Sequence, residues 1–136
     1  MADGPALAWQ KAVIARLKAD ATVSGLVSGR VYDEPPQPAT YPLVRLGVVE
    51  TRIVPTDGRT AWGLTFGVEV HSRPVAGRVE ATRIAEAIVS AMEDVDMEVA
   101  GFGFAWCFFQ TFTVNRAEDG QSYVAIIAFE AMLDAP

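Results

Sequence analysis

Two residues in the chain could act as a general base or a nucleophile: the single histidine, His71, and the single cysteine, Cys107. A catalytic triad or a metal site would need His71 beside a nucleophile, an orienting acid or further ligands, and the sequence shows none of these in place. Cys107 lies in an apolar segment without a neighbouring His or Lys to lower its pKa. We therefore interpret His71 as an imidazole near a strand end and Cys107 as a small buried apolar residue, and we predict that the protein is not an enzyme.

Neither of the other candidate binding motifs matches a known ligand pattern. Glu93, Asp94, Asp96 and Glu98 could bind a hard cation, but the glycine and the distal glutamate of an EF-hand loop are missing. The segment 101–103 (Gly-Phe-Gly) is too short to cradle a phosphate, and no Lys-Ser or Lys-Thr pair follows it. We expect a solvated acidic loop and a bend, with no metal and no cofactor.

Size and charge restrict the class of protein further. The 136 residues suit one domain, residues 1–136, and the 51% hydrophobic content is ordinary for a folded chain. A net charge of -6 disfavours tight general binding to a phosphate backbone. With one cysteine no intrachain disulfide can form, which fits the cytoplasm best. The first five residues carry an acid where a signal peptide needs cations, and no apolar run reaches the roughly 18 residues of a membrane span, so we expect neither export nor membrane insertion.

The segment Thr60–Met92 is expected to form the centre of the fold. Leu64, Phe66, Val68 and Val70 alternate with Thr65, Glu69 and His71, as in a half-buried strand. After Ser72 the spacing becomes helical, with apolar residues at Ala81, Ile84, Ala85, Ile88, Ala91 and Met92. An apolar strand face and an apolar helix stripe joined by a few residues are expected to pack on each other.

The other elements are predicted from caps, prolines and turn signals. Asp3 is expected to cap a helix with Pro5 in its first turn that runs to about Ala19, and a short helical segment from Asp20 is expected to stop at Gly29. Strands are predicted at 30–32 and 41–49, with a long polar hairpin connection over 50–60.

The last third is predicted to be an antiparallel pair, 103–115 and 122–133, with Asp119-Gly120 in the turn. Trp106, Phe108, Phe112 and Val114 are expected to share period two, with Phe109 breaking it. The second strand is apolar on both faces and so must be covered on both. We predict an α+β fold, a mostly antiparallel sheet with two helices packed on one face, whose other face needs a partner chain or a second sheet.

The order of these segments resembles the tail-completion or tail-terminator proteins of long-tailed phages and gene transfer agents. The segments that carry the resemblance are 12–20, 26–33, 41–47, 68–73, 77–85 and 119–130. They span nearly the whole chain, and their order and spacing are more specific than any one of them. The aromatic run 102–112 is richer than the family pattern.

The resemblance implies a structural role. Copies would form a ring, typically a hexamer, that caps the head-proximal end of the tail tube, stops its polymerisation and joins the tail to the head–tail connector. The implied partners are further copies of the chain, the major tail tube protein and the connector or adaptor protein, with DNA passing through the ring without specific binding and no membrane involved. The implied location is the tail neck of a virion or phage-like particle, assembled in the host cytoplasm.

Arginines that flank strands and turns can make bidentate bonds to carboxylates on another protein. Together with the polar face of the central strand and the hairpin, they form the predicted interface with a neighbouring subunit or the tail tube: Arg45, Arg52, Asp57, Arg59, Thr65, Glu69, His71 and Arg73. Two alternatives are a small-molecule binding module with an aromatic pocket around Trp62, Trp106 and Phe108, and another neck or head-closure component.

Overall fold

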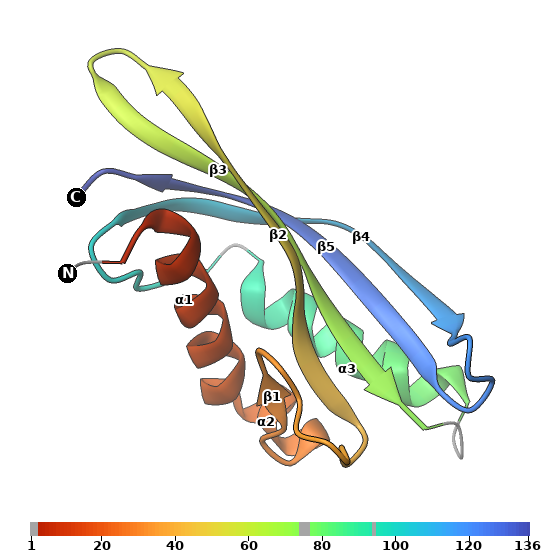
Figure 1. Ribbon diagram of the computed structural model, residues 1–136. Coiled ribbons are helices and arrows are strands. Elements are labelled where there is room, and N and C mark those ends of the chain that lie inside the picture. The colour runs from red at the N-terminus through yellow and green to blue at the C-terminus, as the bar shows by residue number, and fades with distance from the viewer. Residues whose placement is uncertain (1–2, 74–76, 94) are drawn as a thin grey trace.

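The computed structural model describes residues 3–73, 77–93 and 95–136. Its elements are α1 (Pro5–Ala19), α2 (Ala21–Val27), β1 (Val31–Tyr32), β2 (Leu43–Thr56), β3 (Arg59–Ser72), α3 (Arg78–Met92), β4 (Gly103–Arg116) and β5 (Tyr123–Asp134). The strands form one sheet in the order β1-β2-β3-β5-β4, in which β1 pairs with β2 in parallel and the other described pairs are antiparallel. The helices lie on one face of this sheet (Figure 1). On that face α1 packs against β2, and α3 packs against β3, β5 and β4. The predicted α+β class is confirmed, and α2 adds a short third helix to the two long ones.

Strand β3 holds the centre of the sheet and has the predicted alternation. Leu64, Phe66 and Val68 are buried on the helix side, whereas Thr65 and Glu69 are only half-buried on the other face. Helix α3 packs its predicted apolar stripe against this face of the sheet. The buried residues of the stripe are Ala81, Ile84, Ala85, Ile88, Ala91 and Met92. The strand and helix expected to form the centre of the fold therefore do so.

The core is organised around stacked aromatic rings. The Phe66 ring lies 5.2 Å from the Trp9 ring, edge to face, and 5.2 Å from the Phe129 ring, stacked. Trp9 also stacks on Phe104 at 6.1 Å. These contacts join α1, β3, β5 and β4, and each fully buried aromatic side chain adds about 1.5–3 kcal/mol through apolar burial alone.

The β2–β3 hairpin is longer than predicted, because the segment 50–60 is strand rather than connection. Pairing continues from Glu50 opposite Thr65 to Thr56 opposite Arg59, so the turn is only Asp57 and Gly58. Gly58 has φ +69°, a conformation that glycine adopts without steric cost. Both faces of this stretch are polar at the tip, so it lacked the alternation by which strands are recognised. The hairpin extends past the ends of the other strands (Figure 1).

Strand β4 departs from the predicted period because it contains two irregularities. The register shifts between Phe104 and Trp106 and again between Phe109 and Thr111. The second shift turns Phe112 and Val114 to the helix side, where they pair with the buried Ile127 and Ala125. The expectation that Phe112 and Val114 share a face with Trp106 was therefore wrong. A bulge inserts a residue without a partner, and a period-two pattern cannot show where this occurs.

The helix starts are only partly as predicted. Gly4, not Asp3, is the N-cap of α1, and the Asp3 carboxylate instead pairs with Lys11 Nζ at 2.8 Å. Asp20 caps α2 as expected, accepting a hydrogen bond from the Val23 amide at 3.0 Å. The short helix ends at Ser28 and Gly29, both in the left-handed region.

The face of the sheet opposite the helices carries a mixture of apolar and charged side chains, and we call it the open face. Its register rows place Ile126 beside Glu69, and Phe108 beside Glu130. Phe108 is 49% exposed and Ile126 48%. The prediction that β5 is apolar on both faces is correct, and helices of the described chain cover one of them. Within the described ranges, no helix is both long and apolar enough to span a membrane.

Candidate functional site

The predicted interface residues lie mostly on the open face, in separate groups. Arg45, Glu69 and His71 form the first group: the His71 Nε2 and Glu69 Oε1 atoms are 2.9 Å apart, and the Arg45 Nε lies 3.9 Å from the same oxygen. Arg45 also reaches Glu34 at 3.5 Å. Arg45, His71 and Leu43 border a shallow pocket of about 120 Å³ beside the loop 33–42. His71 thus lies near the end of β3, as interpreted from the sequence, and its contact with the Glu69 carboxylate is an addition from the structure.

Arg52 and Thr65 belong to a second group that spans the sheet. Arg52 donates to Thr65 Oγ1 at 3.1 Å and to Glu130 Oε1 at 2.6 Å, and Gln110 donates to the other Glu130 oxygen at 2.7 Å. The bonds therefore connect β2, β3, β5 and β4. Arg52 can lie flat on β3 because Gly63 is beneath it: a Cβ at Gly63 would be 2.7 Å from the guanidinium carbon.

Asp57 and Arg59 form the tip of the β2–β3 hairpin. Both residues are exposed, and the tip is held by a hydrogen bond from Thr56 Oγ1 to the Arg59 carbonyl oxygen at 2.6 Å. Ile53, 71% exposed, follows on the same arm. These residues are separated along β2 and β3 from the group around His71, so the structure does not bring all the predicted residues together.

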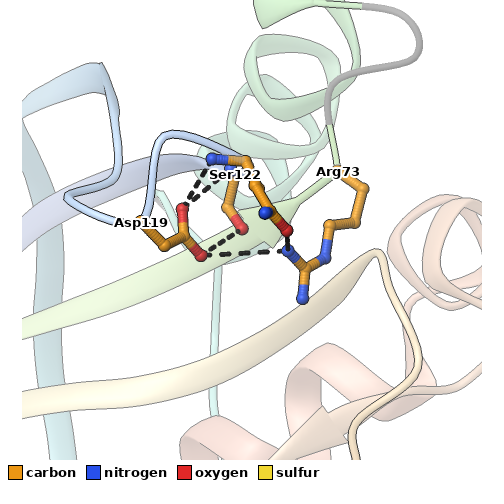
Figure 2. A network of polar contacts seen from close by, with 4 residues as sticks. Arg73, Asp119 and Ser122 are labelled. Carbon is orange, nitrogen blue, oxygen red and sulfur yellow. Dashed lines mark hydrogen bonds and ion pairs between the residues drawn. The ribbon is translucent and has the colours of Figure 1, made fainter.

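Arg73 lies at the opposite end of β3 and joins three segments. Its guanidinium carbon is 4.3 Å from the centre of the Tyr41 ring, and its Nη1 lies 3.8 Å from Asp119 Oδ2. Asp119 accepts hydrogen bonds from the Gln121 and Ser122 amides and from the Ser122 hydroxyl (Figure 2). These bonds, first that from the Gln121 amide, hold the pKa of the exposed Asp119 carboxyl below its ordinary value. Arg73 thus fastens the β4–β5 turn and the loop before β2 to the end of the sheet.

Cys107 behaves as the small buried residue that the sequence indicated. Its side chain is 1% exposed, and burial, together with the charge of Glu93, raises its pKa to about 12. The Glu93 carboxylate accepts a hydrogen bond from the Phe109 amide at 3.1 Å, on the outer edge of β4. No group of His, Cys, Asp and Glu able to hold a metal occurs among the described residues, and Asp94 lies outside them.

The aromatic residues of the alternative binding pocket do not share a cavity. Trp62 pairs across the strands with the buried Leu133 and packs edge to face on Phe102 at 5.2 Å. Trp106 pairs with Met132 on the open face and stacks on Phe108 at 5.2 Å. Since neighbouring positions along a strand point to opposite faces, Trp62 and Trp106 lie on opposite sides of the sheet.

Sequence reasoning missed an arginine cluster at the end of the sheet near Arg73. The guanidinium carbons of Arg78 and Arg116 lie 5.5 Å and 5.6 Å from the centre of the Tyr123 ring. Arg116 also donates to the Tyr123 hydroxyl at 3.3 Å, which lowers the pKa of that phenol. These residues come from α3, β4 and β5, so no local pattern could have shown that they meet.

The chain matches a known protein family over most of its length. Residues 11–134 match the family described as tail completion protein gp17. The chain belongs to this family. The resemblance drawn from the order of segments is confirmed, as is the prediction of a structural, non-enzymatic protein.

A solved structure supports the assignment for nearly the full length of this tail completion protein. A chain from the "Virion of native gene transfer agent (GTA) particle" superimposes with a TM-score of 0.89 at 25% sequence identity, covering 98% of this chain and 100% of that chain. No match was found among curated protein sequences.

Proposed function

We propose that copies of this tail completion protein form a ring, hexameric by the family resemblance, at the head-proximal end of a tail tube. The ring stops polymerisation of the tube and joins it to the head–tail connector. The protein then resides in the tail neck of a virion or phage-like particle after assembly in the host cytoplasm.

The observation that carries this proposal is the full-length likeness to a gene transfer agent virion chain, together with the family match over 11–134. A match over 98% of this chain and 100% of the virion chain supports the same kind of position in a particle.

The open face and the hairpin are the proposed contacts with a neighbouring subunit or with the tail tube. They present the predicted interface residues Arg45, Arg52, Asp57, Arg59, Thr65, Glu69, His71 and Arg73, to which we add Ile53, Phe108 and Ile126. A surface that combines exposed large apolar residues with arginines has the composition of a protein–protein interface. Phe108 and Ile126 share the open face, whereas Ile53 pairs with Trp62 and lies on the other face of the hairpin arm.

The net charge of -6 also suits a ring through which DNA moves. Like charge repels the phosphate backbone, so an acidic subunit lowers nonspecific binding of DNA inside a channel. The proposal therefore includes DNA as a passing molecule and not as a ligand.

The test is to examine particles made without this protein. We expect tubes of uncontrolled length and heads that fail to join to tails, with normal particles restored when the wild-type gene is supplied in trans. Tails of normal length joined to heads in its absence would contradict the proposed role. If tube length were normal but joining failed, the protein would be a neck or head-closure component instead.

A further inference from the structure

The two ends of α3 carry surfaces of opposite charge that are not neutralised within the described chain. At the N-terminal end, Arg78, Arg83 and Arg116 are exposed, and none forms an ion pair with a described carboxylate. Just beyond the C-terminal end, Asp96 and Glu98 are exposed and form no ion pair within the described residues. Arg16 borders a hollow with both acids, but its Nε donates to the Ala91 carbonyl oxygen. Opposite charges left unpaired at two separate places favour a contact between copies rather than a bond within one.

Each surface also has an apolar part. At the basic end, Val79 is 59% exposed and lines a hollow on α3 together with Arg78 and Arg83. Thr82 and Glu86 complete that hollow, so its formal charges are two arginines against one glutamate. We call Arg78, Val79, Arg83 and Arg116 the basic surface.

At the acidic end, Asp96 and Val95 border a hollow of about 160 Å³ against the first half of β4, lined there by residues 104–108. This stretch contains the stacked Trp106–Phe108 pair, and Phe108 is 49% exposed. Glu98 lies with Asp96 along a second hollow, against α1. We call Asp96, Glu98, Trp106 and Phe108 the acidic surface, in which Asp96 borders both hollows. Aromatic faces beside carboxylates suit arginine, which can stack on the rings while it pairs with the acids.

The two surfaces lie towards opposite ends of α3. Helix α3 has 15 residues, so its ends are about 22 Å apart. Figure 1 shows the start of α3 beside the end of β4. At the other end of α3, the Glu93 carboxylate accepts a hydrogen bond from the Phe109 amide in the middle of β4. A contact between unlike patches at opposite ends is heterologous, and repetition of such a contact produces a ring when the rotation closes.

We propose that the basic surface of one copy docks on the acidic surface of the next copy, and that this contact builds the ring. The inference rests on the proposed ring and identifies the surfaces that form it. It leaves the hairpin tip available for another protein of the particle.

The test uses two variants with opposite changes: Arg78→Glu with Arg83→Glu, and Asp96→Arg with Glu98→Arg. All four side chains are exposed, so each variant is expected to keep the circular dichroism spectrum and melting temperature of the wild type. Each variant alone would place like charges together, and we expect the apparent dissociation constant for self-association to rise about tenfold or more.

An equimolar mixture of the two variants should restore assembly. The first variant has two acidic surfaces and the second has two basic surfaces. If the two variants alternate around an even-numbered ring, every contact joins an acidic surface to a basic one. Multi-angle light scattering after size-exclusion chromatography gives the mass of each sample. Recovery of the wild-type mass in the mixture alone would support the proposal.

Two other outcomes would overturn it, and they are distinguishable. If the wild type forms a ring and both variants form it equally well, the ring uses other surfaces, and only this inference fails. If the wild type is monomeric at every concentration, the proposed ring itself is contradicted, and the inference falls with it.

Discussion

Arg52 Nη2, on β2, lies 2.6 Å from Glu130 Oε1, on β5, although β3 separates the two strands. The guanidinium crosses β3 over Gly63, where any Cβ would be 2.7 Å from the guanidinium carbon. The pair is partly exposed, with side-chain exposures of 42% and 31%, so its contribution to stability should be modest. A Cβ at position 63 would therefore require the Arg52 guanidinium to move away from its present position over β3.

Gly63→Ala should therefore break the Arg52–Glu130 bond. In the Arg52→Ala background the same substitution should be neutral or slightly stabilising. Alanine lowers the conformational entropy of the unfolded chain, and its Cβ then meets no guanidinium in the folded state. A double-mutant cycle by urea unfolding should give a coupling energy of about 0.5 kcal/mol or more between positions 52 and 63. Additive effects would contradict the close approach.

Phe66→Ala should lower the free energy of unfolding by about 3–5 kcal/mol, because it leaves a cavity between the Trp9 and Phe129 rings. Ile126→Ala on the open face of β5 is the matched control, since its side chain is 48% exposed. We expect the control to cost less than about 1 kcal/mol in the monomer. Denaturant unfolding of both variants measures the difference, and equal losses would show that the burial pattern is wrong.

The thiol of Cys107 should make stability depend on pH in the alkaline range. Its pKa is 9.0 ordinarily and about 12 in the folded chain, so the folded state retains a proton that the unfolded state releases. The stabilisation of the folded state by this difference is fully present below pH 9 and is lost as pH rises from there towards 12. Unfolding free energies of the wild type should fall more steeply over this window than those of Cys107→Ala. Parallel curves would contradict the raised pKa.

The Asp119 carboxylate should order the β4–β5 turn. Its lowered pKa means that its stabilising bonds are present above the ordinary pKa of 3.8 and are lost as pH falls through the lower folded value. Asp119→Ala should speed hydrogen exchange of the Gln121 and Ser122 amides, which donate to this carboxylate at 2.8 Å and 3.1 Å. Glu118→Ala, in the same turn, is the control and should leave both amides unchanged.

The hairpin tip should matter for assembly and not for folding. Ile53→Ser changes a side chain that is 71% exposed, so the melting temperature should stay close to that of the wild type. If the tip contacts a neighbouring subunit or the tail tube, particles carrying this variant should contain a larger fraction of unjoined tails by electron microscopy. Particle yields equal to those of the wild type would exclude Ile53 from the proposed contact.

The sequence was most informative for elements that bury one face and expose the other face to solvent. The alternation around Phe66 and the helical spacing around Ile84 predicted β3 and α3, because burial selects apolar residues at those periods. The segment 50–56 was missed because it carries Pro55 and exposed residues on both faces, so its strand conformation depends on pairing with β3. The bulges of β4 were missed because an inserted residue changes the facing of Phe112 without changing any residue type.

The candidate surface was predicted only in part for a similar reason. Thr65, Glu69 and His71 were found because they alternate with core positions along one strand. Arg78 and Arg116 meet on Tyr123 through tertiary packing of α3, β4 and β5, and no spacing along the chain records that contact. Family resemblance supplied the proposed ring, and the structure supplied the surfaces that could form it.

The mass of the wild-type protein in solution tests the proposed ring most directly. Light scattering over a concentration series should show a closed oligomer of six times the 14.6 kDa chain mass. The apparent dissociation constant for self-association should rise at high salt, because salt screens the charged surfaces. A mass of one chain at every concentration and salt would contradict the account.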